Sequence, residues 1–288
     1  MSPILMGFVL AVTPGDYANP DMLVEPSNLL TLTDATKRPV RILDARPHAQ
    51  YLAGHIPGTV WVDVPDWAKA FAAGQNEAEW TRRIAALDIG PGDTVVVYDD
   101  NLSKDAARIW YILRYWGCDD VRLLNGGWKA WQASGGKPES GPPIIGKIEL
   151  ELKPQPDRLA TKDQMLDLLK GKSPQIVDAR SNGEFCGTEN TAQRNGSIPG
   201  AVHLEWSDAL DKDTGKFRSA DQLTKLFQKA GIDPSQPAVT YCQSGGRAAV
   251  MAFVLELMGD KNVRSYYRGW SEWGNDADAP IVKPKADK

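Results

Sequence analysis

Residues 237–258 read PAVTYCQSGGRAAVMAFVLELM. An apolar run of strand length ends at Tyr241, a loop with two adjacent glycines runs from Cys242 to Arg247, and the residues after it are apolar except for Glu256. This order predicts a buried strand, a sharp loop and a buried helix. The thiol of Cys242 then lies at the end of the strand, with the N–H groups of the loop and of the helix N-terminus turned toward it. Such N–H groups form an anion site, and the thiolate is the reactive form of cysteine, so a function can be argued from this stretch.

The chain contains a repeat of long period. Four sequence blocks of the first half recur in the same order in the second half. The pairs are RILDAR (41–46) with QIVDAR (175–180), GHIPG (54–58) with GSIPG (196–200), TVVVY (94–98) with AVTY (238–241), and GWKAW (127–131) with GWSEW (269–273). This order argues for two duplicated domains. We expect them at 22–135 and 158–282, joined by a Gly- and Pro-rich linker over 136–157.

Each half alternates short β-branched strands with helices, and the spacing of apolar residues predicts helices over 163–170 and 221–230. Alternation of this kind predicts an α/β fold, in which each domain has a mainly parallel sheet with helices on both faces. Ligands of such sheets bind outside the carboxyl ends of the strands, which is where Cys242 is expected.

The composition is that of an ordinary globular protein, with 288 residues, 42% apolar residues and a net charge of -4. This mild acidity gives no reason to expect a nucleic acid or a membrane as partner. The three cysteines are too few and too scattered for a disulfide framework, and neither they nor the three histidines have the spacing of metal ligands. We therefore expect reduced thiols, no metal and no cofactor.

The N-terminus allows two interpretations. Residues 4–12 are apolar and uncharged, a run too short to span a bilayer, and the positive start of a signal peptide is missing. We expect an apolar extension of a cytoplasmic protein. An exported or periplasmic protein is the alternative, if residues 1–18 are the remnant of a signal peptide.

The two halves differ where the chemistry is expected. Asp99 aligns with Cys242, and its loop, residues 99–105, is acidic and lacks the glycine pair. An anion site cannot work with that charge. The first domain is therefore expected to be catalytically silent, and the second to be catalytic.

These blocks resemble the rhodanese, or sulfurtransferase, family in its tandem form, whose N-terminal domain is inactive. The resemblance covers about residues 22–280. It implies that Cys242 accepts a sulfane sulfur from a small anionic donor, becomes a persulfide and passes the sulfur to cyanide, a thiol or a thioredoxin-like acceptor.

The loop offers hydrogen-bond donors for that persulfide. They are the N–H groups of Ser244, Gly245, Gly246 and Arg247, and the two glycines permit the positive φ that a tight loop requires. The side chains of Gln243 and Ser244 are candidates to bind the oxygens of the donor, or else they face water.

Three arginines are candidates to bind the substrate. Arg247 can hold an anion at the end of the loop, and its alternative is an ion pair at the start of the helix; we favour the first. The resemblance implies a contact of Arg180 with the donor, but its counterpart Arg46 in the silent half fits a structural block equally well. Arg194, in an insertion over 187–195, is a weak candidate by analogy with mercaptopyruvate enzymes.

Other functions of the loop remain as alternatives. Cysteine phosphatases and arsenate reductases have five residues between Cys and Arg, whereas Cys242 and Arg247 are separated by four. A non-catalytic sulfur-binding module does not need the complete loop, and a cysteine hydrolase needs a histidine base. Cys186, which begins the insertion near the expected mouth of the cleft, could resolve a persulfide as a disulfide, although a role outside the reaction is favoured.

The choice of sulfur donor is open within the family. The loop CQSGGR matches neither CRKGVT of the thiosulfate enzymes nor CGSGVT of the 3-mercaptopyruvate enzymes. It keeps a cation, which a dianion prefers. We therefore expect thiosulfate, with 3-mercaptopyruvate as the alternative.

Overall fold

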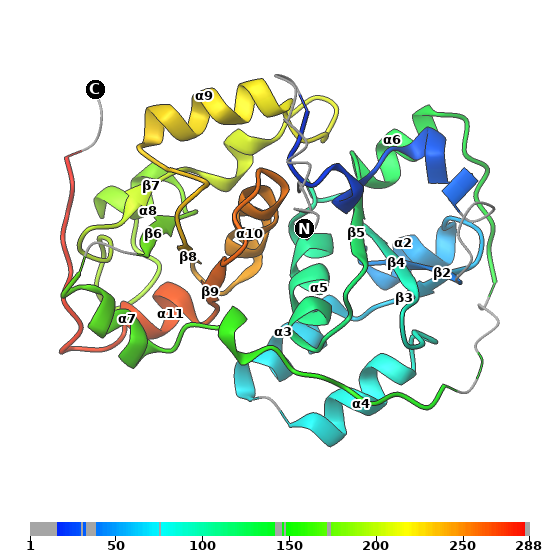
Figure 1. The fold of residues 1–288 in the computed structure, drawn as a ribbon, viewed down its shortest axis with the longest axis horizontal. Helices are drawn as coiled ribbons and strands as arrows, with labels where there is room; N and C mark the ends of the chain where they lie inside the picture. The colour runs from blue at the N-terminus through cyan, green and yellow to red at the C-terminus, as the bar shows by residue number, and fades with distance from the viewer. Residues whose placement is uncertain are drawn as a thin grey trace, which may run out of the picture.

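The computed structural model describes residues 16–29, 31–32, 39–74, 76–141, 146, 148–171 and 174–285. They form two α/β units that lie side by side (Figure 1). The apolar run 4–12, on which the signal-peptide question rests, lies outside the described residues. Among those that are described, no helix is long and apolar enough to cross a membrane.

The first unit is built on a five-stranded sheet in the order β1-β5-β4-β2-β3, and every neighbouring pair is parallel. Its strands are β1 (Leu23–Val24), β2 (Val40–Asp44), β3 (Thr59–Trp61), β4 (Thr94–Tyr98) and β5 (Val121–Leu124). Its α-helices are α2 (His48–Ala53), α3 (Val64–Ala73), α4 (Glu77–Ala85), α5 (Lys104–Tyr115) and α6 (Gly127–Ala133), with short 3-10 helices η1 (Pro20–Met22) and η2 (Pro26–Asn28).

The second unit has a four-stranded parallel sheet in the order β7-β6-β8-β9. Its strands are β6 (Gln175–Asp178), β7 (Val202–His203), β8 (Ala238–Tyr241) and β9 (Arg264–Tyr266). Its helices are η3 (Pro156–Arg158), α7 (Lys162–Leu168), α8 (Asn182–Cys186), η4 (Trp206–Ala209), α9 (Ala220–Ala230), α10 (Gly246–Leu257) and α11 (Gly269–Trp273). Read from its other edge, as β9-β8-β6-β7, this order corresponds to β5-β4-β2-β3 of the first unit. The prediction of two parallel α/β domains is therefore confirmed.

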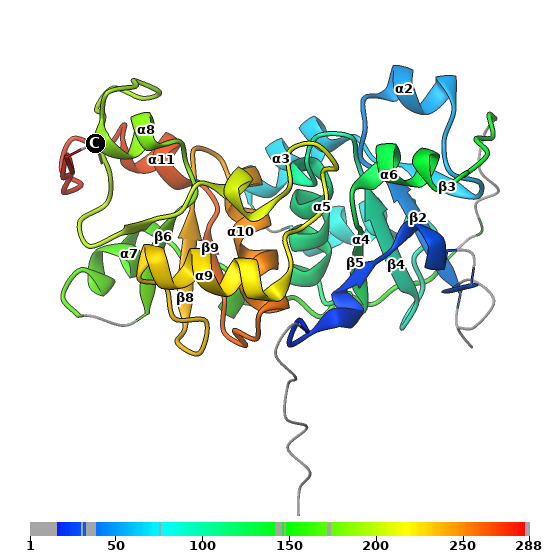
Figure 2. The same ribbon diagram turned by 90° about the horizontal axis from the view of Figure 1, so that it is seen from above.

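Helices α5 and α10 lie between the two sheets (Figures 1 and 2). They pack closely against each other, and the rings of Trp110 and Phe253 meet edge to face at 5.1 Å. Every residue of α10 except Arg247 is buried, as expected for a helix that is apolar on all sides. One core cluster therefore runs from the first sheet through both helices to the second sheet.

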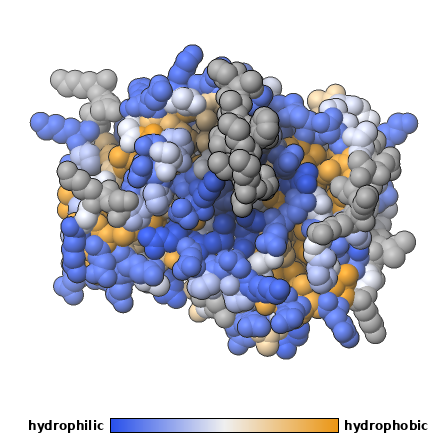
Figure 3. All heavy atoms as spheres, in the orientation of Figure 1, coloured by the Kyte–Doolittle hydropathy of each residue, from blue (hydrophilic) through white to orange (hydrophobic). Residues whose placement is uncertain are grey.

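The outer faces of the sheets have smaller cores of their own. The surface over the seam between the units, on the face seen in Figure 3, is mostly hydrophilic. The apolar side chains at the seam are used in the packing of the two units, which fixes the two loops that follow β4 and β8 relative to each other.

Candidate active site

Cys242 follows β8 directly, and the loop after it leads into α10. Cys242 is 1% exposed. Its carbonyl oxygen accepts a hydrogen bond from the N–H of Trp270 at 2.8 Å. A Cβ on Gly269, which has φ +53°, would lie 2.1 Å from that oxygen, so this close approach requires glycine. The start of α11 thereby holds the backbone of the cysteine in place.

The loop presents N–H groups that are not used within the protein. Gly245 has φ +89° and precedes Gly246, the first residue of α10. Within the described residues, the backbone N–H groups of Ser244, Gly245 and Gly246 donate to no protein acceptor. Unused N–H groups at a helix N-terminus bind anions, as the sequence predicts for this loop.

The corresponding loop of the first unit is filled by its own carboxylate. Asp99 follows β4 and is buried, and its two oxygens accept four backbone hydrogen bonds of 2.8 to 3.1 Å from the loop and the start of α5. The donors are Asn101, Ser103, Asp105 and Ala106. Burial raises the pKa of Asp99 to about 6, against the opposing effect of these bonds. The loop thus carries a built-in anion in place of a reactive group.

Arg247 lies beside Cys242 and is held by a buried carboxylate. Its two terminal nitrogens donate to the two oxygens of Glu184 in α8, at 2.5 and 2.9 Å. Burial by itself would lower the pKa of Arg247, but its hydrogen bonds to Glu184 and the nearby Cys242 more than offset this and raise the pKa. The structure shows the ion pair of Arg247, while binding of an anion by this residue stays a prediction that its place beside the thiol allows.

Glu184 was not predicted as a site residue from the sequence. Its residue is 4% exposed, and its N–H and carboxylate complete a capping box with Ser181 at the start of α8. The Ser-x-x-Glu spacing is a signal for such a helix start. It could have located the helix, although not the contact with Arg247.

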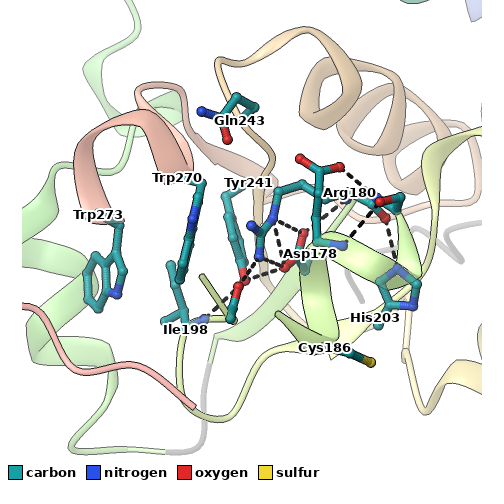
Figure 4. A network of polar contacts seen from close by, with 12 residues as sticks. Asp178, Arg180, Cys186, Ile198, His203, Tyr241, Gln243, Trp270 and Trp273 are labelled. Atoms are coloured by element: carbon teal, nitrogen blue, oxygen red, sulfur yellow. Dashed lines mark hydrogen bonds and ion pairs between the residues drawn. The ribbon is translucent and has the colours of Figure 1, made fainter. Parts of the chain in front are cut away.

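Arg180 lies in a closed structural network (Figure 4). It is 0% exposed. Its guanidinium donates to both oxygens of Asp178 and, at 2.8 Å, to the carbonyl of Gly196, while the ring of Trp270 covers it at 4.3 Å. These bonds use Nε and Nη2 and support the structural role, whereas Nη1 makes no hydrogen bond among the described residues, so the contact with a donor stays a prediction.

The silent half contains the same network. Arg46 donates to Asp44 and, at 2.8 Å, to the carbonyl of Gly54, and the ring of Trp128 covers it at 3.9 Å. A substrate contact would not need to be reproduced in a domain that has Asp99 in the place of the cysteine. The Asp-Ala-Arg block is therefore part of the framework of both domains.

The other candidate side chains hold the insertion in place. The amide of Gln243 exchanges two hydrogen bonds of 2.9 Å with Thr191. Arg194 donates to backbone carbonyls in the segment 273–277. Cys186 is buried at the end of α8 and lies apart from Gln243 in Figure 4, near His203. The hydrogen bonds of Gln243 and Arg194 thus fix the insertion, which is a structural role for both side chains.

One residue of the first unit reaches the loop and was not predicted. Arg108, on α5, donates from Nη1 to the carbonyl of Ser244 at 2.7 Å and to the hydroxyl of Tyr267 at 2.6 Å. The pKa of Tyr267 is raised overall. Burial is the largest cause, Arg108 opposes it by its charge and its hydrogen bond, and nearby Cys242 adds to the rise. Tyr267 therefore lies within the electrostatic reach of the thiol.

Comparison with known proteins agrees with the repeated architecture. The family model described as a rhodanese-like domain matches twice, over residues 26–134 and 161–276. The chain is a member of the rhodanese family. This confirms the prediction of a tandem rhodanese enzyme that the repeated blocks carried.

Several rhodanese relatives match this chain over nearly its whole length. The chain is 34% identical to the thiosulfate sulfurtransferase of Corynebacterium glutamicum, and the match covers 92% of each of the two chains. The sulfur carrier protein TtuD of Thermus thermophilus is 32% identical, with 93% of this chain and 98% of that one covered. Among solved rhodanese structures, SseA from Escherichia coli, a 3-mercaptopyruvate sulfotransferase, matches with a TM-score of 0.74 at 25% identity, over 87% of this chain and 99% of that one.

Proposed function

We propose that this rhodanese is a thiosulfate sulfurtransferase in which Cys242 carries the sulfur as a persulfide. The Cys242 thiolate attacks the outer sulfur of thiosulfate, a new S–S bond forms, and sulfite leaves with the electron pair of the broken bond. The persulfide then gives its outer sulfur to a nucleophile such as cyanide, which becomes thiocyanate, and the thiolate is regenerated. Charge and atoms balance in both steps, so no cofactor is required.

The contrast between the two loops supports this proposal most directly. The Asp99 carboxylate fills the ring of N–H donors in the first domain, whereas the donors of the second domain have no protein acceptor among the described residues. A persulfide is an anion that needs such donors at the end of the Cys242 side chain. The proposed domain bounds, 22–135 and 158–282, place one loop in each domain.

The size of the loop favours sulfur over a tetrahedral oxyanion. Helix α10 begins at Gly246, and α5 begins at Lys104, so the catalytic loop is one residue shorter than the silent one. A shorter loop makes a smaller cradle around Cys242. This favours a sulfurtransferase over a cysteine phosphatase or an arsenate reductase.

The relatives narrow the choice of sulfur donor and of sulfur acceptor. Relatives named thiosulfate sulfurtransferase, including that of Pseudomonas aeruginosa at 30% identity over 92% of this chain, favour thiosulfate as the donor. The likeness to SseA keeps 3-mercaptopyruvate as the alternative. The relative named sulfur carrier protein makes a protein thiol a reasonable acceptor beside cyanide and small thiols.

The experiment is the intact mass of the purified protein after incubation with thiosulfate, followed by peptide mapping. We expect a gain of one sulfur atom on Cys242 that cyanide removes, and no gain in Cys242→Ser. Cys118→Ser and Cys186→Ser, the matched controls, should gain the sulfur as the wild type does. The absence of a gain with either thiosulfate or 3-mercaptopyruvate would refute the proposed function, and loss of the gain in Cys186→Ser would assign that thiol a part in the cycle.

A further inference from the structure

The Cys242 loop receives a guanidinium from the silent domain. Arg108 lies on α5 and reaches across the seam, where Nη1 donates to the Ser244 carbonyl at 2.7 Å and to the Tyr267 hydroxyl at 2.6 Å. Its guanidinium carbon lies 5.5 Å from the centre of the Tyr267 ring. The two hydrogen bonds and the contact with the Tyr267 ring thus fix the position of the Arg108 side chain next to the loop.

The glycine pair makes this approach possible. A Cβ on Gly246 would lie 2.6 Å from Nη2 of Arg108, and a Cβ on Gly245 would lie 2.5 Å from the ring of Tyr267. Each glycine therefore leaves the space that one of these two side chains occupies. The sequence explains the glycines by backbone conformation alone, and the structure adds the entry of Arg108.

The two guanidiniums at the loop differ in their charge balance. Arg247 is neutralised by Glu184 through two hydrogen bonds. Arg108, in contrast, has no carboxylate partner in the part of the chain that the structure describes, and its hydrogen bonds use Nη1 only. Since a guanidinium keeps its charge at all ordinary pH values, Arg108 brings an uncompensated positive charge to the loop.

A dianionic donor needs such a charge. Thiosulfate approaches a thiolate against like-charge repulsion, and the protein as a whole has a net charge of -4. A local cation at the mouth of the loop offsets this repulsion and fixes the orientation of the anion. Arg247 supplies little net charge because Glu184 cancels it.

We propose that Arg108 of the silent domain binds the sulfonate end of the donor at Cys242, so that the two domains share one active site. This rests on the proposed function, because it names the residue that recognises the dianionic donor. The silent domain then contributes to catalysis through α5, although its own loop is closed by Asp99.

The first test is steady-state kinetics with thiosulfate. Arg108→Gln should raise KM about tenfold or more, the factor that one charge-assisted hydrogen bond supplies, with a smaller change in kcat. Arg108→Lys, which keeps the charge, should lose less. Arg268→Gln is the matched control, because Arg268 also donates across the seam, to the carbonyl of Ala72, but is 55% exposed and makes no contact with the loop. It should keep the KM of the wild type.

An unchanged KM in Arg108→Gln would overturn the proposal. An equal loss in Arg108→Lys and Arg108→Gln would also overturn it, because packing and not charge would then be the cause. Thermal unfolding of each variant shows whether the comparison is made between folded proteins.

The second test does not depend on sulfur transfer. The alkylation rate of Cys242 by anionic iodoacetate is divided by the rate with neutral iodoacetamide. This ratio should fall several-fold in Arg108→Gln. It should also fall in Gly246→Ala, whose methyl group displaces the flexible end of Arg108 without removing its charge.

The two tests separate the two proposals. If the wild type gains no sulfur from thiosulfate and the ratio still falls, Arg108 attracts anions but the proposed function is wrong. If the wild type forms the persulfide and neither KM nor the ratio changes in Arg108→Gln, the function stands and the role of Arg108 is refuted.

Discussion

The N–H of Trp270 donates to the carbonyl of Cys242 at 2.8 Å, and the N–H of Trp128 donates to the carbonyl of Asp99 at the same distance. Each tryptophan is the second residue of the corresponding helix, α11 or α6, so the proposed nucleophile Cys242 and its counterpart Asp99 are held in one backbone frame. The difference between the domains therefore lies in the side chain and the loop that follow, and not in the framework.

Asp99→Ala should destabilise the protein without removing its chemistry. The change leaves four N–H donors around a buried position without their acceptor. We expect a loss of at least about 2 kcal/mol in the free energy of unfolding, measured by denaturant titration. Asp100→Ala, the neighbouring control, should have little effect. Persulfide formation by the folded Asp99→Ala protein should continue, and its disappearance would show that the first loop takes part in the reaction.

Arg247→Ala should weaken the use of the donor. The loss of a charge-assisted contact beside Cys242 should cost about 1–3 kcal/mol in kcat/KM for thiosulfate. Since the variant also leaves Glu184 buried without its partner, the unfolding free energy should fall as well. The double variant Arg247→Ala/Glu184→Gln should recover part of the stability but not the kinetics. Unaltered kinetics in Arg247→Ala would return this residue to a purely structural role.

The Glu184 carboxyl should contribute to acid sensitivity. Burial raises its pKa, but the hydrogen bonds from Arg247 and Ser181 more than offset this and hold it below the ordinary value of 4.5. A depressed pKa stabilises the fold above the unfolded value, and this stabilisation is lost as the pH falls through the folded value. In unfolding titrations from about pH 7 down to about pH 3, Glu184→Gln should start lower and decline less steeply than the wild type. Parallel curves would show that the pair contributes no pH dependence.

The two Asp-Ala-Arg networks allow a matched comparison. Arg180→Lys and Arg46→Lys each replace a planar guanidinium, held through Nε and Nη2, with an ammonium that cannot reproduce its bonds. Both should lower the free energy of unfolding by roughly 2–4 kcal/mol, and both should leave KM for thiosulfate unchanged in the folded protein. A rise in KM in Arg180→Lys alone would restore the contact with the donor that the family resemblance implies.

The sequence predicted the features that repeat or follow one another along the chain. The duplicated blocks predicted the two parallel sheets, and the strand, loop and helix around Cys242 are where the periodicity puts them, with α10 over Gly246–Leu257. For Arg180 the sequence left a structural role and a contact with the donor level, because of its counterpart Arg46.

The contacts between residues far apart in the sequence were beyond such reasoning. Arg108 reaches Ser244 over a separation of 136 residues, and Arg247 reaches Glu184 over 63. Neither pair has a local spacing that would mark it, because the packing of α5 against α10 and of α8 beside the loop decides which side chains meet. A sequence reveals the candidate nucleophile, whereas its cations depend on tertiary packing.

Helix α10 is buried on all sides, by its own sheet and by α5 of the other domain. A duplication usually yields two modules that can be separated, but here neither half could leave without exposing the apolar face it shares with the other. The chain contains two domains of one family, but we expect them to unfold together as one cooperative unit, in a single thermal transition.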